Sequence, residues 1–358
     1  MKYLFVVQGE GRGHITQAIT LSELLHRNGH EVVEVLIGKS KGREIPTFFF
    51  EKINAPVLLL ETPSFILKKN RKNIHLLKTI LYNIQSKRLK KYNKSIKLIH
   101  KRIKELKPDA MINFYEPLVG LTCLKYNLQT PVISIGHQFL FRHPDFKFNN
   151  SKEKNILFFR LHTLLCQIGS SKTLALSFYD LKDCQSEHLV TVPPLIRQEV
   201  KMVKPTDGNY ILGYLTSTGF EKEVREWHKK HPETELHFFQ DRKESEYQVD
   251  KTLTLHAVND DKFLEYMAGC GGFISTAGFE SVCEAMYFDK PILLIPFHIE
   301  QKINALDAES TGSSILSKSF NITLLLDYIE NRKFDAMTFR KWVDSAEEIF
   351  LKQLTNDN

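Results

Sequence analysis

Residues 2–38 read KYLFVVQGEGRGHITQAITLSELLHRNGHEVVEVLIG, and this stretch decides the fold class. The apolar run at 2–7 ends at glycines, as a buried parallel strand does. Residues 15–29 place apolar side chains at helical spacing and stop at Gly29, a typical helix C-terminal signal. A second apolar run follows at 31–38. This order of strand, helix and strand predicts a βαβ unit and therefore a parallel sheet.

The alternation of strand and helix patterns continues along the chain and is interrupted once. Residues 192–210, VPPLIRQEVKMVKPTDGNY, contain three prolines and mixed charges, which is typical of a linker. We therefore expect an N-terminal domain at 1–195, a linker at 196–209 and a C-terminal domain at 210–338. A C-terminal helix within 339–358 is expected to pack back on the first domain.

Short apolar runs bounded by turn residues predict further strands on both sides of the linker. They lie at 108–114, 130–138, 173–178, 188–192, 210–215, 235–239, 252–258, 271–276 and 291–296. Helical patterns separate them, at about 72–106, 118–127, 221–231, 260–270, 279–288 and 339–353. The fold class is therefore α/β, with two Rossmann-like parallel-sheet domains facing across a cleft.

Composition limits the classes of protein to which the chain can belong. With 358 residues, of which 42% are hydrophobic, two globular domains are expected rather than a disordered chain. The five cysteines are an odd number without a CxxC pair, which favours a reducing compartment over a disulfide framework or a zinc site. The N-terminus does not match a signal peptide and no run reaches about 20 apolar residues, so we expect a cytoplasmic protein.

The net charge of +7 is concentrated in one region. Residues 68–107 contain fifteen Lys or Arg and a single acid, Glu105. One interpretation is a solvated pair of helices on the N-terminal domain. The other is that IHLLKTILYNI, at 74–84, is an amphipathic segment that rests on an anionic membrane surface, at the inner face of the membrane. A nucleic-acid partner is not expected, because the stretch lacks the interleaved aromatic residues that stack on bases.

The glycine-rich turn GEGRGH, at 9–14, has two interpretations. It is either a tight strand-to-helix turn that needs positive φ angles, or a backbone stripped of side chains so that a ligand can approach. The spacing differs from the dinucleotide-binding fingerprint. Glu31 and Glu34 are poorly placed to hold an adenosine ribose, so that fingerprint is not met.

A second glycine-containing turn lies in the C-terminal half. In GGFISTAGFESVCEAM, at 271–286, a small-residue turn opens a helix, so backbone N–H groups near Ala277, Gly278 and Phe279 form a natural seat for a pyrophosphate. Glu284 lies on this helix among apolar or small neighbours and can accept bonds from two ribose hydroxyls. The polar residues His298, Glu300 and Gln301 follow the next strand at its carboxyl end, where parallel sheets bind ligands.

Taken together these stretches resemble the GT-B glycosyltransferases, the group that includes the UDP-glucuronosyltransferases and the N-acetylglucosaminyltransferase of lipid II synthesis. The most specific part is STAGFESVCEAMYFDKPILLIPFHIEQKINA, at 275–305. The resemblance implies that Gly278 and Ser281 belong to the diphosphate turn and that Glu284 holds the ribose. It further implies that Glu300 and Gln301 hold hydroxyls of the donor sugar, with Asn304 supporting the loop.

One position departs from the family pattern. Plant and animal members carry a histidine two residues before the motif glycine, where it donates to the diphosphate, and this chain has Thr276 there. A hydroxyl donates one hydrogen bond but carries no charge, so the affinity or preference for the donor can differ.

The resemblance also implies a mechanism, an inverting transfer of a hexosyl group from a nucleotide-diphosphate sugar, here a UDP-sugar, to a hydroxyl acceptor. His14 matches the family's general base, and Glu116, after the strand at 108–114, is expected to orient its imidazole. Gly11 and Gly13 are expected to bring their backbone close to the donor, and His137 and Gln138 are expected to contact the acceptor. No metal or other cofactor is expected, because helix dipoles and side chains supply the positive field in GT-B enzymes.

Two other functions fit the same fold. A sugar-nucleotide epimerase or hydrolase would need several additional carboxylates, and few are present near these motifs. A non-catalytic nucleotide-sugar binder would not need His14, although the intact Glu284, Glu300 and Gln301 favour retained donor binding.

Overall fold

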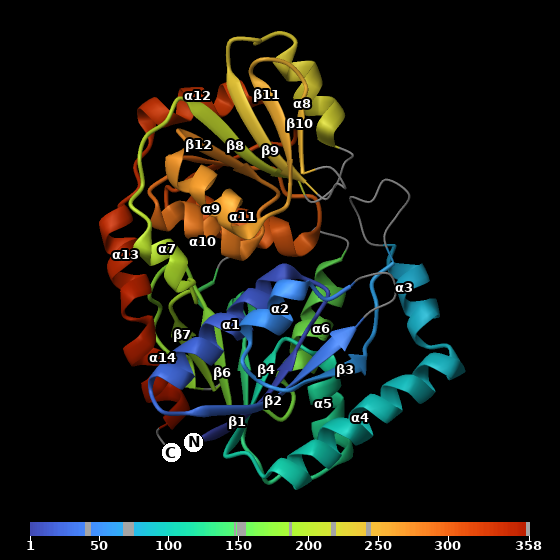
Figure 1. The fold of residues 1–358 in the computed structure, drawn as a ribbon. Coiled ribbons are helices and arrows are strands. Elements are labelled where there is room, and N and C mark those ends of the chain that lie inside the picture. Colours follow the sequence, from blue (N-terminus) through green and yellow to red (C-terminus); the bar gives the residue numbers. More distant parts are fainter. Residues whose placement is uncertain are drawn as a thin grey trace. The chain divides into compact units, whose positions relative to one another are not determined.

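The computed structural model describes residues 1–39, 44–66, 75–146, 148, 155–185, 188–215, 220–240 and 245–355. Within these ranges the chain forms two compact units (Figure 1). The first unit contains residues 1–66, 75–195 and the chain from Val343 on, and the second contains residues 196–342. Each unit is built on one sheet with helices packed against it, which confirms the α/β fold class.

The described strands of the first unit form a seven-stranded sheet in which every pair is parallel. Their order is β3 (Val57–Glu61), β2 (Glu31–Lys39), β1 (Lys2–Val7), β4 (Ala110–Phe114), β5 (Val132–Ile135), β6 (Lys172–Leu176) and β7 (Leu189–Val192). The strand order reverses between β1 and β4. In open parallel sheets ligands bind beside such a reversal, at the carboxyl ends of the strands.

The helices of this unit connect successive strands. They are α1 (Arg12–Arg27), α2 (Thr47–Lys52), α3 (Leu76–Asn83), α4 (Ser86–Leu106), α5 (Pro117–Lys125), the 3₁₀-helix η1 (His137–Arg142), α6 (Ile156–Gln167) and α14 (Ala346–Thr355). One face of the sheet is covered by α4 and α5, where the buried Ile99 and Ile103 pack in one cluster with Leu4 and Met111. Removing such side chains from water is the main stabilising contribution to this face.

The sequence predicts helical structure at about 72–106, and the described part of this range forms two separate helices. Helix α3 ends at Asn83 and α4 begins at Ser86, with Gln85 as its N-cap, and residues 72–74 lie outside the described ranges. The apolar pattern also missed α2, β3 and α6. Strand β3 lies at the edge of the sheet and most of its side chains are exposed. It is therefore not a buried strand of the kind that apolar runs predict.

The second unit also contains a seven-stranded sheet among its described residues. The order is β10 (Glu246–Gln248), β11 (Leu253–Ala257), β9 (Glu235–Gln240), β8 (Tyr210–Leu215), β12 (Gly272–Ser275), β13 (Ile292–Leu294) and β14 (Ser314–Leu316). All described pairs are parallel except that β10, a short strand at the edge of the sheet, runs antiparallel to β11. Its helices are α7 (Gln198–Met202), α8 (Glu221–His228), α9 (Asp260–Gly269), α10 (Phe279–Tyr287), α11 (Ile299–Ser310), α12 (Ile322–Asn331) and most of α13 (Ala336–Asp344).

The C-terminal segment is two helices, not the single helix expected at 339–353. Helix α13 ends at Asp344 and α14 begins at Ala346. Helix α14 packs on the first unit, where the Tyr3 hydroxyl donates to the Leu354 carbonyl at 3.1 Å and Lys172 Nζ donates to the Gln353 carbonyl at 2.9 Å. The last described helix of the chain thus completes the unit that begins with the first strand.

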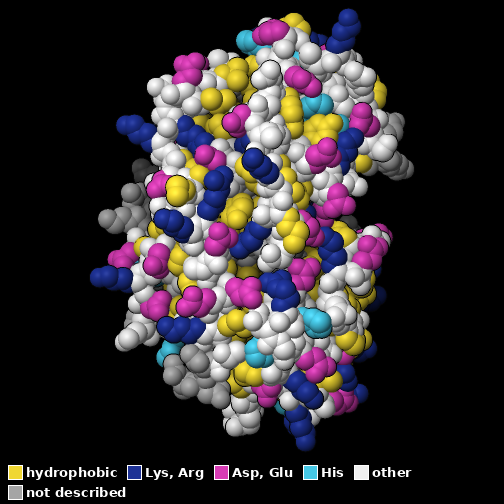
Figure 2. All heavy atoms as spheres, turned by 60° about the vertical axis from the view of Figure 1, so that its left-hand side comes forward, with side chains coloured by type: hydrophobic (Ala, Val, Ile, Leu, Met, Phe, Trp, Pro, Cys, Tyr) yellow, Lys and Arg dark blue, Asp and Glu magenta, His cyan; other side chains and the backbone are white. Residues whose placement is uncertain are grey.

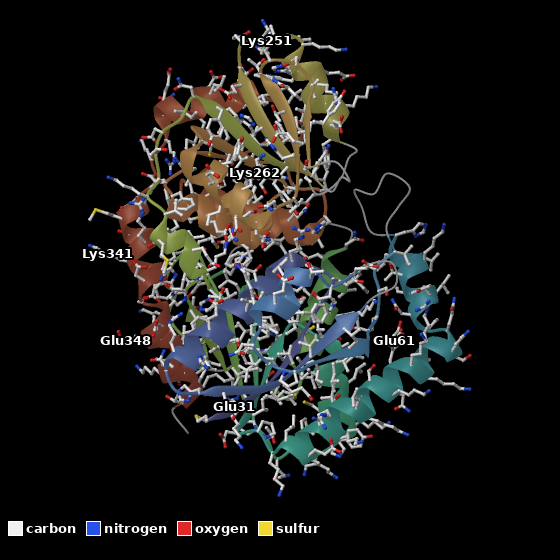
Figure 3. All side chains as sticks on the ribbon, in the orientation of Figure 1. Glu31, Glu61, Lys251, Lys262, Lys341 and Glu348 are labelled. Atoms are coloured by element: carbon white, nitrogen blue, oxygen red, sulfur yellow. The ribbon has the colours of Figure 1, made fainter. Side chains whose placement is uncertain are left out.

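Charge is distributed unevenly over the surface. Figure 2 shows one face on which Lys and Arg side chains are interspersed with Asp and Glu. The basic excess lies on α4, which exposes Lys87, Lys90 and Lys94. Glu61, labelled in Figure 3 at the end of β3, forms an ion pair with Lys91 at 2.9 Å. None of the helices in the described part of the chain is long and apolar enough to cross a bilayer.

Candidate functional site

His14 lies in the first turn of α1, just beyond the carboxyl end of β1, and its side chain is buried. Its Nδ1 is 3.2 Å from Gln17 Oε1, one turn along the helix, and its Nε2 is 3.3 Å from Gln138 Nε2. Because Gln17 offers a carbonyl and Gln138 an amide N–H, this pattern assigns the proton of the neutral ring to Nδ1. Nε2 is then the nitrogen with the basic lone pair.

Tyr115 supports the same imidazole from the side. Its ring stacks on His14 at 5.6 Å on one face and on His162 at 5.2 Å, and its hydroxyl is 2.6 Å from Thr163 Oγ1. Tyr115 has a φ of 59°, in the left-handed region that a bulky residue rarely adopts. Such backbone strain tends to occur where a site requires it, and here it directs the tyrosine ring toward His14.

Glu116 does not orient His14, contrary to the expectation from the sequence. Its Oε1 accepts from the Thr62 hydroxyl at 2.6 Å and from the Leu118 backbone N–H at 3.2 Å, so the carboxyl is the N-cap of α5. The other oxygen, Oε2, is buried without a hydrogen-bond partner among the described residues. The physical reason is local, because a carboxyl one residue before Pro117 is ideally placed to cap the helix that follows.

The Glu116 carboxyl is completely buried, and burial raises its pKa to about 7. The bonds from Thr62 and Leu118 act in the opposite direction, and the charge of Glu10 adds to the increase. Gly38, at the end region of β2, leaves the space for this carboxyl, because a Cβ there would lie 2.5 Å from Oε2. Desolvation therefore favours the neutral acid in this position.

Of the glycines of the first turn, Gly9 is required for close approach of the backbone, and neither Gly9 nor Gly11 has a positive φ angle. A Cβ on Gly9 would overlap the Gly38 carbonyl oxygen, so β1 and β2 pass too closely for a side chain there. Gly11 is the N-cap of α1 with an extended φ of −121°, and a Cβ on it would meet no atom within 4 Å. Gly13 is in the first turn of α1. The expectation that this turn needs positive φ is therefore wrong at Gly9 and Gly11.

The two residues expected to contact the acceptor lie at the start of η1, after β5. Gln138 reaches His14, as described above, so it belongs with the imidazole. The His137 Nδ1 is 2.8 Å from the Leu176 carbonyl at the end of β6. Its proton therefore sits on Nδ1, which ties the loop after β5 to the neighbouring strand.

In the second unit, the turn between β12 and α10 has the geometry of an anion seat. Ala277 has a φ of 65°, and Gly278 is the N-cap of α10 without a side-chain cap bond. The first backbone bond into the helix runs from the Val282 N–H to the Gly278 carbonyl at 3.3 Å. The N–H groups of Phe279, Glu280 and Ser281 lie in the first turn of the helix, and helix N-termini favour anions.

Side-chain amides of α11 hold this turn in place. Gln301 Nε2 donates to the Thr276 hydroxyl at 3.3 Å, and Gln301 Oε1 accepts from the Phe297 N–H at 3.0 Å. Asn304 Nδ2 donates to the Ala277 carbonyl at 3.0 Å, which is the supporting contact implied by the resemblance. Thus both ends of the Gln301 amide have partners inside the unit, while Glu300, in the first turn of α11, is half-buried.

Glu284 is buried on α10 and does not lie on a solvated face of the helix. Arg197 donates to it twice, from Nε to Oε1 at 2.7 Å and from Nη2 to Oε2 at 3.2 Å. Burial raises the pKa of Glu284, and the charge of Arg197 opposes this increase. Ser281, on the exposed side of the first turn, donates to the Gly278 carbonyl at 3.2 Å.

The structure thus forms two groups of predicted residues. In the first unit His14 and Gln138 are together, and in the second Thr276, Ala277 and Gln301 are together. Sequence reasoning missed three partners, namely Gln17, Tyr115 and Arg197. The i to i+3 spacing of His14 and Gln17 on one helix was a usable signal, whereas nothing in the linker pattern singled out Arg197.

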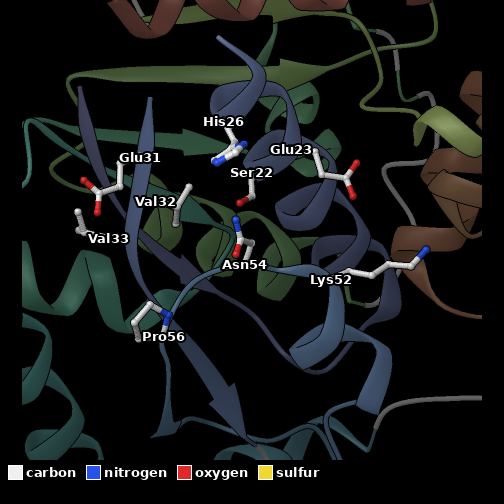
Figure 4. Close-up of a pocket in the computed structure, with 9 residues that line it drawn as sticks. All are labelled: Ser22, Glu23, His26, Glu31, Val32, Val33, Lys52, Asn54 and Pro56. Carbon is white, nitrogen blue, oxygen red and sulfur yellow. The ribbon is translucent and has the colours of Figure 1, made fainter. Parts of the chain in front are cut away.

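A separate cavity of about 390 Å³ lies at the opposite edge of the first sheet (Figure 4). It is lined by residues at the end of α1 and the start of β2, including His26 and Glu31, together with Lys52 and Asn54. His14 lies at the carboxyl ends of the strands, where parallel sheets bind ligands, and we therefore do not assign the site to this cavity. Among the described residues, no group of three or more His, Cys, Asp or Glu is arranged to hold a metal ion.

The pKa of Glu116 predicts how stability changes with pH. Because the folded-state pKa of about 7 is above the ordinary value of 4.5, the folded protein retains a proton that the unfolded chain loses. The free energy of unfolding should therefore fall by about 3 kcal/mol as pH rises from about 4.5 to 7. Glu116→Gln should remove this contribution, while Glu51→Gln, at an exposed position, should not. Equal pH dependence of urea unfolding in wild type and Glu116→Gln would contradict the assignment.

Comparisons with known proteins agree with this arrangement of two units. Residues 1–331 match the model of the family described as glycosyl transferase family 1. A stretch of 48 residues is 44% identical to mogroside IIIx synthase of Siraitia grosvenorii, and this match spans 13% of the chain and 11% of that protein.

The fold matches solved glycosyltransferases along nearly the whole chain at low sequence identity. The glycosyltransferase of kitacinnamycin gives a TM-score of 0.64 at 13% identity, covering 99% of both chains. UGT89C1 of Arabidopsis thaliana, solved with quercetin, gives a TM-score of 0.62 at 13% identity, covering 97% of this chain and 94% of that one. UGT2 of Phytolacca americana, solved with UDP-2fluoro-glucose and pterostilbene, gives a TM-score of 0.63 at 13% identity, covering 98% of this chain and 96% of that one. With two α/β units and a family model that matches most of its length, the chain belongs to glycosyl transferase family 1 and is a glycosyltransferase of the GT-B fold.

Proposed function

We propose that the protein transfers a hexosyl group from a UDP-sugar to a hydroxyl acceptor. The observation that carries the proposal is the turn at Thr276–Phe279, where the N-terminus of α10 follows the carboxyl end of β12. A diphosphate fits this N-terminus, because its negative charge complements the positive end of the helix dipole. Glu284, two turns along the same helix, is then within reach of the ribose of the same nucleotide. The structure of UGT2 with UDP-2fluoro-glucose, on the same fold, supports this choice of donor.

His14 is the proposed general base. Its Nε2 carries the lone pair in the hydrogen-bond pattern described above, and a neutral imidazole can take the proton of an acceptor hydroxyl at neutral pH. Gln17 and Tyr115 hold the ring, and Gln138 must release Nε2 or share it when an acceptor arrives. Attack by the deprotonated oxygen on the sugar's anomeric carbon, with UDP as leaving group, inverts that centre. We propose that the positive field of α10 stabilises the leaving diphosphate without a metal ion.

One observation favours an acceptor at a membrane surface. Helix α3 and the residue after it expose Leu77, Leu81 and Ile84, each more than half accessible to solvent. The exposed Lys87 and Lys90 follow on α4. Apolar side chains flanked by lysines are the composition that binds anionic lipid surfaces, so we propose that a lipid-linked or envelope acceptor is met there.

Donor binding is tested by Glu284→Gln. The amide keeps the size of the side chain but loses the charge that strengthens bonds from ribose hydroxyls, so the affinity for UDP should fall about tenfold, as for about 1.4 kcal/mol. Isothermal titration calorimetry with UDP measures this, with the exposed Glu309→Gln on α11 as the control. Unchanged UDP affinity in a folded Glu284→Gln protein would exclude the ribose role.

The role of His14 is tested by His14→Ala in a transfer assay that contains EDTA. After a screen of UDP-sugars and hydroxyl acceptors has identified a productive pair, kcat should fall about a hundredfold or more, which is typical for loss of a general base. The affinity for UDP should stay within about twofold, since the donor residues lie in the second unit. The control is His26→Ala, an exposed position on the same helix. A wild-type enzyme that EDTA inactivates and Mg²⁺ restores would contradict the metal-free mechanism, and unchanged kcat in His14→Ala would make the histidine structural.

Membrane association is tested by replacing exposed lysines. Lys87, Lys90 and Lys94 changed to Glu should reduce sedimentation with phosphatidylglycerol vesicles, because each basic residue near such a surface contributes about 1 kcal/mol. Arg88 and Lys91 are left unchanged, since Arg88 lies over the Tyr82 ring and Lys91 pairs with Glu61. The control carries Glu at Lys229 and Lys230 of the second unit. If wild type and the triple variant sediment equally with the vesicles, the membrane interpretation is wrong and α4 is a solvated helix.

A further inference from the structure

The ion pair between Arg197 and Glu284 is the most buried charged contact near the proposed donor site. The side chains are only 13% and 8% exposed, and the guanidinium donates one bond to each carboxylate oxygen. Within the described part of the chain, the hydrogen bonds of the Glu284 side chain all go to Arg197. Removing both charges from water costs free energy that offsets their attraction, so a buried pair of this kind contributes little to stability. Its presence beside the proposed donor site is better explained by a role in binding.

We propose that Arg197 is a positioning residue for nucleotide recognition, which keeps the Glu284 carboxylate ionised and oriented for the two ribose hydroxyls. This inference rests on the proposed function, in which Glu284 binds the ribose. Arg197 itself touches neither the sugar nor the reacting atoms in this role.

The number of acceptor sites on the carboxylate fits this role. Each carboxylate oxygen has two lone pairs, and Arg197 uses one on each oxygen. One lone pair on each oxygen is then left, which gives one acceptor for each of two adjacent hydroxyls. The planar guanidinium fixes the carboxylate plane through two parallel bonds, which a lysine ammonium cannot do.

The charge of Arg197 is needed because the rest of the environment favours a neutral carboxyl. Burial raises the pKa of Glu284, and the nearby acids Asp260 and Glu199 raise it further. Arg197 acts in the opposite direction through both its charge and its hydrogen bonds. A protonated carboxyl would lose acceptor capacity and would be a poorer partner for two hydroxyl donors.

The backbone that carries Arg197 is fixed within the second unit. Arg197 is the N-cap residue of α7, and its neighbours Ile196 and Val200 are buried. The freedom that Arg197 loses on binding Glu284 is therefore that of its side chain, while its backbone is already held. The segment that the sequence pattern identified only as a linker therefore contributes directly to the proposed donor site.

The experiment compares UDP with 2′-deoxy-UDP by calorimetry at pH 8 and pH 6. Wild type should prefer UDP about tenfold, the value of one charge-assisted hydrogen bond. Arg197→Met should reduce this preference to about twofold or less, and its UDP affinity should fall several-fold further at pH 6 than at pH 8. Arg197→Lys retains the positive charge but not the two parallel bonds. It should keep the pH profile of wild type and lose part of the preference for UDP.

The matched control is Arg225→Gln, which breaks another Arg–Glu pair of the same unit, with Glu221 at 2.6 Å. It should leave both the preference and the pH profile unchanged. Equal loss of affinity for UDP and 2′-deoxy-UDP in Arg197→Met would overturn the inference, because a merely structural role lowers both alike. If Arg197→Met does not fold, an unchanged preference in Arg197→Lys overturns it instead. Wild type without any preference for UDP would refute the ribose role of Glu284, and hence the proposed function, before Arg197 is considered.

Discussion

The Glu116 carboxyl joins three loops of the first unit at the carboxyl ends of its strands. It accepts from Thr62 after β3, caps the helix after β4, and fills the space left by Gly38 near the end of β2. A Cβ on Gly9 would overlap the Gly38 carbonyl oxygen, and a Cβ on Gly38 would meet Glu116 Oε2 and the Thr62 side chain, so neither position tolerates a side chain. Glu116, Gly38 and Gly9 thus form one line of close contacts, which sets the path of the chain into α1. The hydrogen bonds of the Glu116 carboxyl go to Thr62 and Leu118 and not to His14.

The two units solve the problem of a buried carboxyl in opposite ways. Glu116 accepts hydrogen bonds from a hydroxyl and a backbone N–H but has no cation beside it, so burial favours its protonated, neutral form. Glu284 has a guanidinium, and the pair as a whole is neutral while the carboxyl stays charged. A neutral acid suits a position that holds the backbone together. A compensated carboxylate suits one that has to accept hydrogen bonds from a ligand.

The fold was predictable because its signals are periodic and local. The apolar runs of β1, β4, β12 and β13 are buried on both faces, and the small-residue turn before α10 is contiguous in the sequence. The partners of the site were less predictable, because they depend on which strand ends lie side by side. Gln138 meets His14 across 124 positions, and Arg197 meets Glu284 across 87. The assignment of Glu116 to the imidazole failed for a simple reason, since a residue before a proline at a helix start caps that helix.

The chain enters the second unit after Leu195 and returns to the first at Val343, and this crossing affects synthesis. Helix α14 covers the first sheet near Tyr3 and Lys172, and the buried Phe350 belongs to it. On the ribosome, strands β1 to β7 emerge long before this helix does. The first unit must therefore wait, with apolar surface still uncovered, while the whole second unit is translated. Until α14 is translated, the surface against which the buried Phe350 packs stays accessible to solvent, and transiently exposed apolar surface of this kind favours aggregation.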